Sequence, residues 1–105
     1  MSNYLLAYRG GGTPPTEEER EAVMAAWMEW FGSLGEAVVD GGNPFAASVT
    51  VGAGGSVSEG GASALTGYSV IAADSLDAAG ELAKGCPILD DDGGTVEVYE
   101  TIRVM

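Results

Sequence analysis

The fold of this chain is decided by residues 16–35, TEEEREAVMAAWMEWFGSLG. The first four residues match a helix capping box, in which the Thr16 hydroxyl accepts a hydrogen bond from the Glu19 amide and the Glu19 side chain reaches back to Thr16. The glutamates also suit the positive end of a helix dipole. Apolar side chains then recur at helical spacing, and the stretch predicts an amphipathic helix that ends near Gly35. Its apolar face is formed by Val23, Trp27, Trp30, Phe31 and Leu34.

Apolar runs around this helix predict strands. Residues 4–8 form an aromatic-rich run that reads as a buried strand, and residues 10–15 form a loop. A short second strand is predicted over 36–39 and a third over 46–51. The glycine-rich turn at 52–56 indicates a hairpin that leads into residues 57–58. Further strands are predicted over 65–73 and 95–104.

A second helix is predicted after Asp74-Ser75, which supply its N-terminal cap. One face of this helix carries small and apolar residues, and Gly85 and Pro87 end it. That face consists of Leu76, Ala79, Leu82, Ala83 and Cys86.

The predicted order is β-α-β-β-(β)-α-β in one domain, residues 1–105. Two helices can cover only one face of an antiparallel sheet of four or five strands, so the fold class is α+β, a ferredoxin-like sandwich. The other face must contact water or a partner. In the last strand, one face carries polar side chains that suit either water or a lined cavity: Glu97, Tyr99, Thr101 and Arg103.

Composition limits the possible functions. The chain has 105 residues, of which 46% are hydrophobic and 19% charged, so it can form a core. Its net charge of -12 argues against nucleic acid and against an anionic membrane surface as partners. It contains no histidine, which excludes Ser-His-Asp and Cys-His nucleophiles and His-ligated zinc. The single cysteine, Cys86, excludes an intrachain disulfide and a CxxC motif.

The N-terminus has no basic segment followed by an apolar stretch, and no apolar run reaches the roughly 20 residues that cross a bilayer. We therefore expect a reduced, cytoplasmic protein, for which a lone thiol is typical. The strong acidity indicates either a general route to solubility or life at high salt.

Segments spread over the whole chain resemble the YCII-related (DGPF-domain) family. They are residues 4–9, 27–35, 67–68, 73–79, 85–87 and 96–100. The resemblance implies a ferredoxin-like protomer that pairs face to face with a second copy into a dimeric α+β barrel. The helix-free face of each sheet would then be buried in a homodimer.

The chain departs from the family pattern at three places. The DGPF signature would fall at residues 59–62, where only an acid followed by glycine is kept. The histidine that the family is thought to use with an aspartate would stand at Trp27. The CPH run of many relatives reads Cys86-Pro87-Ile88 here. The resemblance therefore implies the fold and the dimer more than the acid–base chemistry.

Two motifs favour structural interpretations. Arg9-Gly10-Gly11-Gly12 lies between a strand and a helix, but Pro15 replaces the last glycine of a dinucleotide fingerprint and no Gly-Lys-Ser/Thr follows. Residues 90–92 are three aspartates, but their spacing does not fit an EF-hand and favours a solvated turn. No metal and no cofactor is predicted. Cys86 lies near a helix C-terminus, which disfavours a thiolate and favours a buried, inert side chain.

The remaining candidates form two sets. Tyr8, Arg9, Trp27, Tyr68 and Arg103 are candidates for binding a small organic ligand. Aromatic residues at helical spacing are also typical of a core, and each arginine could instead pair with a nearby glutamate.

Asp40 and Glu97 are candidates for a catalytic general base. Such a base would need a pKa raised towards neutrality by burial. Asp40 could equally form a turn with the Gly-Gly-Asn-Pro that follows it.

Three functions follow from these candidates. The first is a homodimeric protein that binds a small organic molecule in the barrel cavity. The second is an acid/base enzyme acting on a carbonyl or lactone compound, with Arg9 or Arg103 polarising the substrate. The third is an interaction module linked to transcription or signalling, which the resemblance implies because some relatives are encoded beside or fused to sigma factors.

Overall fold

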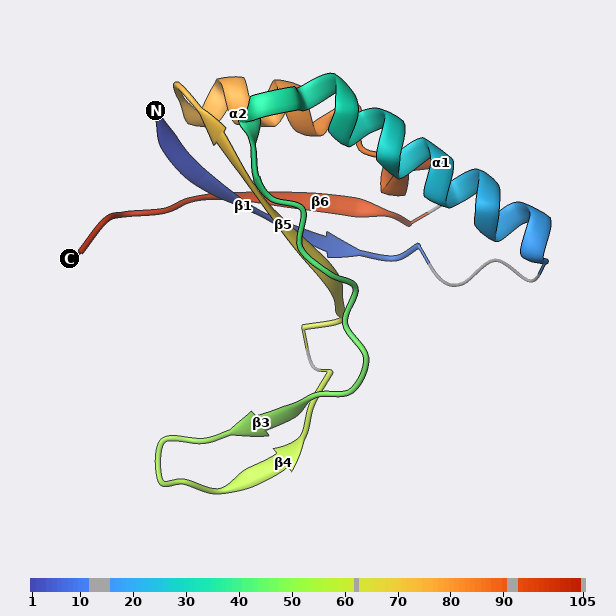
Figure 1. Cartoon of the computed structure of the whole chain (residues 1–105). Coiled ribbons are helices and arrows are strands. Elements are labelled where there is room, and N and C mark those ends of the chain that lie inside the picture. The colour runs from blue at the N-terminus through green and yellow to red at the C-terminus, as the bar shows by residue number, and fades with distance from the viewer. Residues whose placement is uncertain (12–15, 62, 91–92, 105) are drawn as a thin grey trace.

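The computed structural model describes residues 1–11, 16–61, 63–90 and 93–104. Figure 1 shows the helices and strands in their order along the chain. The elements are β1 (Ser2–Arg9), α1 (Glu17–Leu34), η1 (Gly35–Ala37), β2 (Val38–Asp40), β3 (Val49–Val51), β4 (Val57–Glu59), β5 (Leu65–Ala73), α2 (Leu76–Ala83), η2 (Pro87–Asp90) and β6 (Thr95–Glu100).

Four strands form the main sheet in the order β2-β5-β1-β6, and all neighbours are antiparallel. Both helices lie on one face of this sheet (Figure 1). The chain is therefore an α+β protein with an antiparallel sheet and two helices, which is compatible with the predicted ferredoxin-like fold. Neither sheet closes into a barrel.

Both helices begin where the sequence predicts. The Thr16 hydroxyl accepts a hydrogen bond from the Glu19 amide at 3.1 Å, and the Ser75 hydroxyl accepts one from the Ala78 amide at 3.1 Å. α1 ends at Leu34, and its C-cap is Gly35, whose positive φ of 56° suits a residue without a Cβ. The local capping signals were sufficient to place these ends.

The core lies between the sheet and the helices. Tyr4, Leu6 and Tyr8 alternate along β1 towards the helices and pack with buried residues of β5 and α2. The two helices are also joined directly, because the indole Nε1 of Trp30 donates a hydrogen bond to the Leu82 carbonyl at 3.2 Å. Cys86 is buried in this core, as predicted.

The predicted apolar face of α1 is only partly buried. Trp30 is its buried member, whereas Val23 is exposed. In Figure 1 the N-terminal half of α1 extends past the ends of the strands, so nothing of the sheet lies beneath it. Leu76, predicted on the inner face of α2, is also exposed because it is the first residue of that helix.

The predicted hairpin is present, but its position relative to the main sheet differs from the predicted one. Residues 46–51 and 57–58 were expected to contribute strands next to the sheet, yet β3 and β4 form a separate two-stranded sheet that stands away from it (Figure 1). The chain before the hairpin occupies the edge of β5: Pro44 bridges to Gly67, and the Phe45 amide donates to the Thr66 carbonyl at 2.8 Å. The main sheet consequently has four strands.

The last strand is shorter than the predicted 95–104. It ends at Glu100, which pairs with Tyr4, and residues 101–104 are not in a strand. The Thr101 amide and hydroxyl both donate to the Asn3 carbonyl, at 3.2 and 2.7 Å, and the chain then runs past the start of β1. Ile102 and Val104 are therefore exposed.

Other boundaries shift slightly. β1 extends beyond the predicted 4–8, β2 begins at Val38 after a turn of 3-10 helix instead of at residue 36, and β5 matches the predicted 65–73. Residues 12–15 of the predicted loop over 10–15, and Asp91 and Asp92 of the predicted turn, lie outside the described residues. In the part of the chain that the structure describes, no helix is both long and apolar enough to span a membrane.

Candidate functional site

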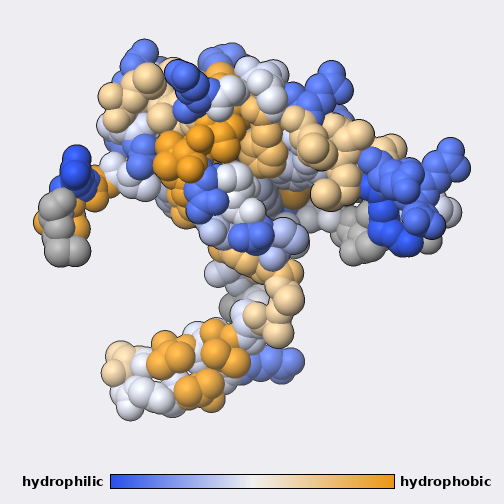
Figure 2. All heavy atoms as spheres, viewed as in Figure 1, coloured by the Kyte–Doolittle hydropathy of each residue, from blue (hydrophilic) through white to orange (hydrophobic). Residues whose placement is uncertain are grey.

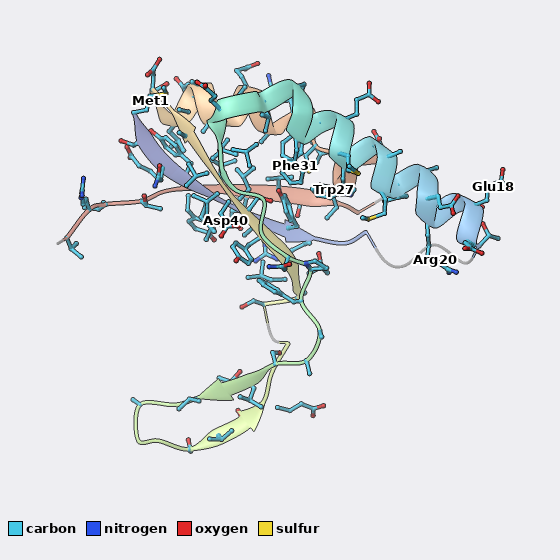
Figure 3. The ribbon with its side chains drawn as sticks, in the orientation of Figure 1. Met1, Glu18, Arg20, Trp27, Phe31 and Asp40 are labelled. Atoms are coloured by element: carbon cyan, nitrogen blue, oxygen red, sulfur yellow. The ribbon has the colours of Figure 1, made fainter. Side chains whose placement is uncertain are left out.

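The predicted ligand-binding residues lie on two opposite faces of the sheet. Because side chains alternate along a strand, Tyr8 points towards the helices and Arg9 towards the helix-free side. Trp27 and Phe31 lie between α1 and the sheet (Figure 3). Tyr68 and Glu97 both pair with Ala7 of β1 and so share the helix-free side, which we call the open face.

Tyr8 belongs to the core, and the partly buried Trp27 packs against it. Their rings meet edge to face with centroids 5.2 Å apart, and Tyr8 is almost completely buried. Trp27 also packs against Trp30 and Phe31 of its own helix. Of the two interpretations of these aromatic residues, ligand binding and core packing, the observed packing supports core packing.

The polar end of Tyr8 belongs to a buried hydrogen-bond chain. Its hydroxyl donates to the Ser69 Oγ at 2.7 Å, and that oxygen donates onward to the Gly41 carbonyl at 2.7 Å. Ser69 is 0% exposed. Burial raises the pKa of the Tyr8 hydroxyl well above its usual value, so Tyr8 stays neutral. The chain ties β1 and β5 to the loop after β2.

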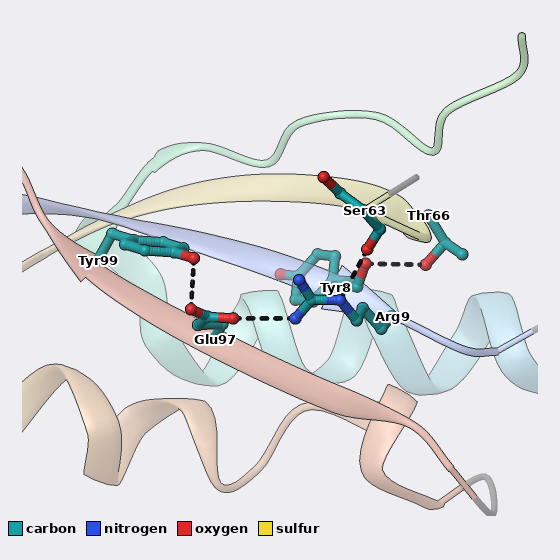
Figure 4. Close-up of polar contacts among 6 residues, drawn as sticks. All are labelled: Tyr8, Arg9, Ser63, Thr66, Glu97 and Tyr99. Atoms are coloured by element: carbon teal, nitrogen blue, oxygen red, sulfur yellow. Dashed lines mark hydrogen bonds and ion pairs between the residues drawn. The ribbon is translucent and has the colours of Figure 1, made fainter. Parts of the chain in front are cut away.

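The open face carries one cluster of charged and polar groups. The Arg9 Nη1 lies 2.9 Å from the Glu97 Oε2, and the Arg9 Nε donates to the Ser63 carbonyl at 2.9 Å. The Tyr99 hydroxyl donates to the other oxygen of Glu97 (Figure 4). The side chains of Arg9 and Glu97 are 37% and 45% exposed. This cluster is accessible to a molecule placed against the open face.

The contacts of Glu97 oppose its use as a general base. The hydrogen bond from Tyr99 and then the one from Arg9 stabilise the carboxylate and lower the pKa of Glu97 below its ordinary value. Catalysis of proton abstraction near neutral pH needs a shift in the other direction. The pKa of Tyr99 is raised, chiefly because its hydroxyl donates to the Glu97 carboxylate.

Asp40 forms a turn. Its Oδ1 accepts a hydrogen bond from the Gly42 amide at 2.9 Å, as in an Asx-turn. Gly42 has a φ of 74° and lies so close to the Tyr68 carbonyl that a Cβ there would stand 1.7 Å from that oxygen. The alternative considered for Asp40, a turn without chemistry, accounts for this arrangement.

The other candidates are dispersed. The Tyr68 ring stacks on Phe45 with centroids 5.9 Å apart, beside the base of the β3–β4 hairpin. Arg103 lies beyond the end of β6 and not on a strand. Burial raises the pKa of the Cys86 thiol to about 11, so a thiolate is disfavoured there.

Three contributors to these networks were not singled out from the sequence. Ser69 lies in a buried strand where serine gives no signal beyond its position. Tyr99 was placed on the correct face by alternation, but its hydrogen bond to Glu97 was not foreseen. The Ser63 carbonyl reaches Arg9 only because the loop before β5 folds back beside β1. A backbone carbonyl has no side-chain signature.

Two surface hollows lie apart from these residues. Two shallow hollows lie on the helices: one along α1 near Arg20, Met24 and Met28, the other near Trp30 and Pro87. Neither is lined by a predicted site residue. Across the described residues, no group of three or more histidine, cysteine, aspartate or glutamate side chains could hold a metal ion.

Comparison with known proteins adds no assignment: no family model matches the chain, and no curated protein matches it.

Proposed function

We propose that this chain binds a small organic molecule, bearing a carboxylate or a similar acceptor group, at the open face of its sheet. A second copy of the chain would cover that face, as in the dimeric α+β barrel that the resemblance to the YCII-related family implies. Arg9 would bind the acceptor group of the ligand, and Tyr99 and Tyr68 would flank it.

The observation that supports this proposal is the Arg9–Glu97–Tyr99 cluster on a face that the helices leave uncovered. Its guanidinium is fixed at Nε by the Ser63 carbonyl and at Nη1 by Glu97. A planar guanidinium presents five N–H donors, so two contacts leave donors for a ligand.

The surroundings of the cluster suit a ligand with an apolar part. Leu5 and Val70 are paired residues of the central strands, lie on the open face and are only half-buried in one chain. Burying such side chains against an apolar group is favourable by about 25 cal/mol per Å². A second copy would exclude water from both the apolar surface and the charged cluster, which strengthens electrostatic contacts.

A binding function is favoured over an acid/base enzyme by the direction of the Glu97 pKa. Asp40 is engaged in a turn, Tyr8 is buried in the core, and Trp27 packs partly buried against it. A ligand held by Arg9 requires no proton transfer.

The test is calorimetric titration of the protein with a panel of small organic carboxylates that differ in their apolar part, after thermal-shift screening. A ligand at 100 times its Kd stabilises the fold by about 2.7 kcal/mol. Arg9→Ala should weaken binding by tenfold or more, because a hydrogen bond to a charged group contributes about 1.5–3 kcal/mol.

The matched control is Arg20→Ala, which removes the same charge from α1, away from the open face. It should leave the affinity within about twofold, since a surface charge at a distance is largely screened. Equal affinities for the Arg9→Ala variant and the unaltered protein would contradict the proposal, as would a panel from which no carboxylate binds.

A further inference from the structure

One chain exposes more surface than a closed fold of its mass. A monomer of this mass has a typical accessible surface of about 5,500 Å², whereas this chain exposes 7266 Å². Its radius of gyration is 15.2 Å, against about 13 Å for a compact domain of this length. The excess surface, about 1,800 Å², exceeds the roughly 800 Å² that each partner buries in a standard protein interface.

Much of this open shape comes from the arm, which we define as residues 46–61 and which carries the β3–β4 hairpin. In Figure 1 the helices lie above the sheet and the arm lies below it, on the side of the open face. Figure 2 shows the arm standing clear of the rest of the molecule. A hairpin of two strands is marginally stable in water without a surface to pack on.

One face of the arm is mainly apolar and the other is polar. Val51 pairs with Val57, and Val49 pairs with Glu59, so the three valines share a face that also carries Glu59 beside Val49. Thr50 pairs with Ser58 on the opposite face. The valines are 64–67% exposed, and Figure 2 shows their apolar surface on the arm. Apolar residues confined to one face of a hairpin indicate a face that is covered by something.

The base of the arm is fixed to the sheet. On one side the Phe45 amide bonds to the Thr66 carbonyl and the Phe45 ring stacks on Tyr68. On the other side the Ser63 carbonyl accepts from Arg9. These contacts hold both ends of the arm beside the sheet, and its valines are left exposed by the rest of the same chain.

The charges permit a second copy of the chain as the partner. The acidic excess lies mainly on the helices and their ends, for instance at Glu17–Glu19 and Glu21 of α1. The open face carries Glu97, which is paired with Arg9, and the valine face of the arm carries one carboxylate, Glu59. Two copies can therefore approach through the open face and the arm while most of their carboxylates point away.

We infer that the arm clasps a second copy of this chain, with Val49, Val51 and Val57 packed against the partner. A two-fold axis makes the contact reciprocal, since each copy then supplies one arm and receives one. The inference rests on the proposed pairing of two copies across the open face and adds a second contact surface to it. Contact through the arm also accounts for the excess accessible area, because covering the sheet face alone would not require a surface that large.

The test is sedimentation equilibrium of the full chain and of four variants over a range of concentrations. Val51→Asp and Val57→Asp place a charge on the valine face. Thr50→Asp and Ser58→Asp place the same charge one residue away, on the opposite face of the same hairpin. The unaltered protein should dimerise. Each valine variant should raise the dimer Kd by about 100-fold or more, because the substitution occurs twice in a symmetric interface.

The threonine and serine variants should change the dimer Kd by only a few-fold. Circular dichroism and thermal unfolding at a concentration where every variant is monomeric check that the valine variants still fold. A monomeric unaltered protein, or equal effects of Val51→Asp and Thr50→Asp, would overturn the inference.

The outcomes also separate this inference from the proposed function. If the dimer Kd is insensitive to Val51→Asp but ligand binding requires Arg9, the inferred arm contact is wrong and the proposed binding site stands. A dimer broken by Val51→Asp, with carboxylate binding unchanged in the monomer, would support the arm and show that the site does not need the second copy.

Discussion

Ser69 connects three parts of the chain although it is a single small side chain. It accepts from Tyr8 of β1 and donates to Gly41 of the loop after β2, and both contacts are 2.7 Å long. A buried hydroxyl without a partner is costly, so removing Ser69 would affect Tyr8 as well. The burial of Ser69 and the turn at Asp40 and Gly42 together position the base of the arm.

We therefore expect Ser69→Ala to destabilise the fold by about 1–3 kcal/mol, because it leaves the Tyr8 hydroxyl and the Gly41 carbonyl unsatisfied in the interior. Urea unfolding followed by tryptophan fluorescence measures this difference. Ser58→Ala, on the exposed hairpin, is the control and should have an effect within about 0.5 kcal/mol. A neutral Ser69→Ala would mean that the chain contributes nothing to stability.

Trp27, a candidate for ligand binding, contributes instead to packing between α1 and the sheet. It packs edge to face on Tyr8, with ring centroids 5.2 Å apart. An indole at this point fills the space between α1 and the sheet (Figure 3). The position serves packing in this chain, while the accessible polar groups lie on the other side of β1.

At the scale of elements, the N-terminal half of α1 is stabilised more by its cap than by burial of its side chains. Its first half extends past the sheet and buries no side chain, so tertiary packing does little there to hold the helix. The Thr16 cap and the acidic first turn then contribute directly to helix formation.

We expect Thr16→Ala to cost about 0.5–2 kcal/mol in the free energy of unfolding, with fraying of the first turns of α1, since the Glu19 amide loses its acceptor. Hydrogen exchange of the amides in the first turns reports the fraying. Thr16→Ser keeps the hydroxyl and should retain most of the stability. Equal protection in all three proteins would show that the cap is dispensable.

The hairpin is the element whose placement depends on the rest of the fold. Its turn is made by a glycine-rich segment in which the Gly55 φ is 86° and the Gly52 amide donates to the Ser56 carbonyl at 2.7 Å. These local features specify a hairpin. Its direction comes from Pro44 and Phe45, which continue along the edge of β5 and leave no room for β3 in the main sheet.

At the scale of the whole molecule, charge and shape act together. A net charge of -12 opposes self-association, while the uncovered sheet face and the arm favour it. The balance must depend on ionic strength, since salt screens repulsion between distant surface charges.

We expect the dimer Kd to fall severalfold as the salt concentration rises from about 0.1 M to about 1 M, where the screening length shortens from roughly 10 Å to 3 Å. Sedimentation equilibrium in the two buffers measures the shift. Lys84→Ala, which makes α2 more acidic, should steepen the salt dependence slightly. Dissociation of the dimer by salt would instead point to an interface held by ion pairs and would contradict the proposed arrangement.

The sequence by itself determined the features that depend on neighbouring residues. Thr16 and Ser75 predict the starts of their helices because a cap is a contact between residues three positions apart. The extent of β5 follows in the same way from the residues at 65–73. The alternation of Tyr8 and Arg9 across the sheet is likewise a local rule. These features were sufficient for the α+β class and for the predicted pair of helices on one face.

Only the tertiary structure decided which candidates meet. Arg9 and Glu97 are 88 residues apart in the sequence, and they meet because β1 and β6 are paired neighbours in the sheet. Tyr8 and Trp27 lie on the opposite face of the sheet from this pair. The position of the arm was decided in the same way, by long-range hydrogen bonds at its base. Such contacts depend on strand order and register, which a local pattern of residues does not encode.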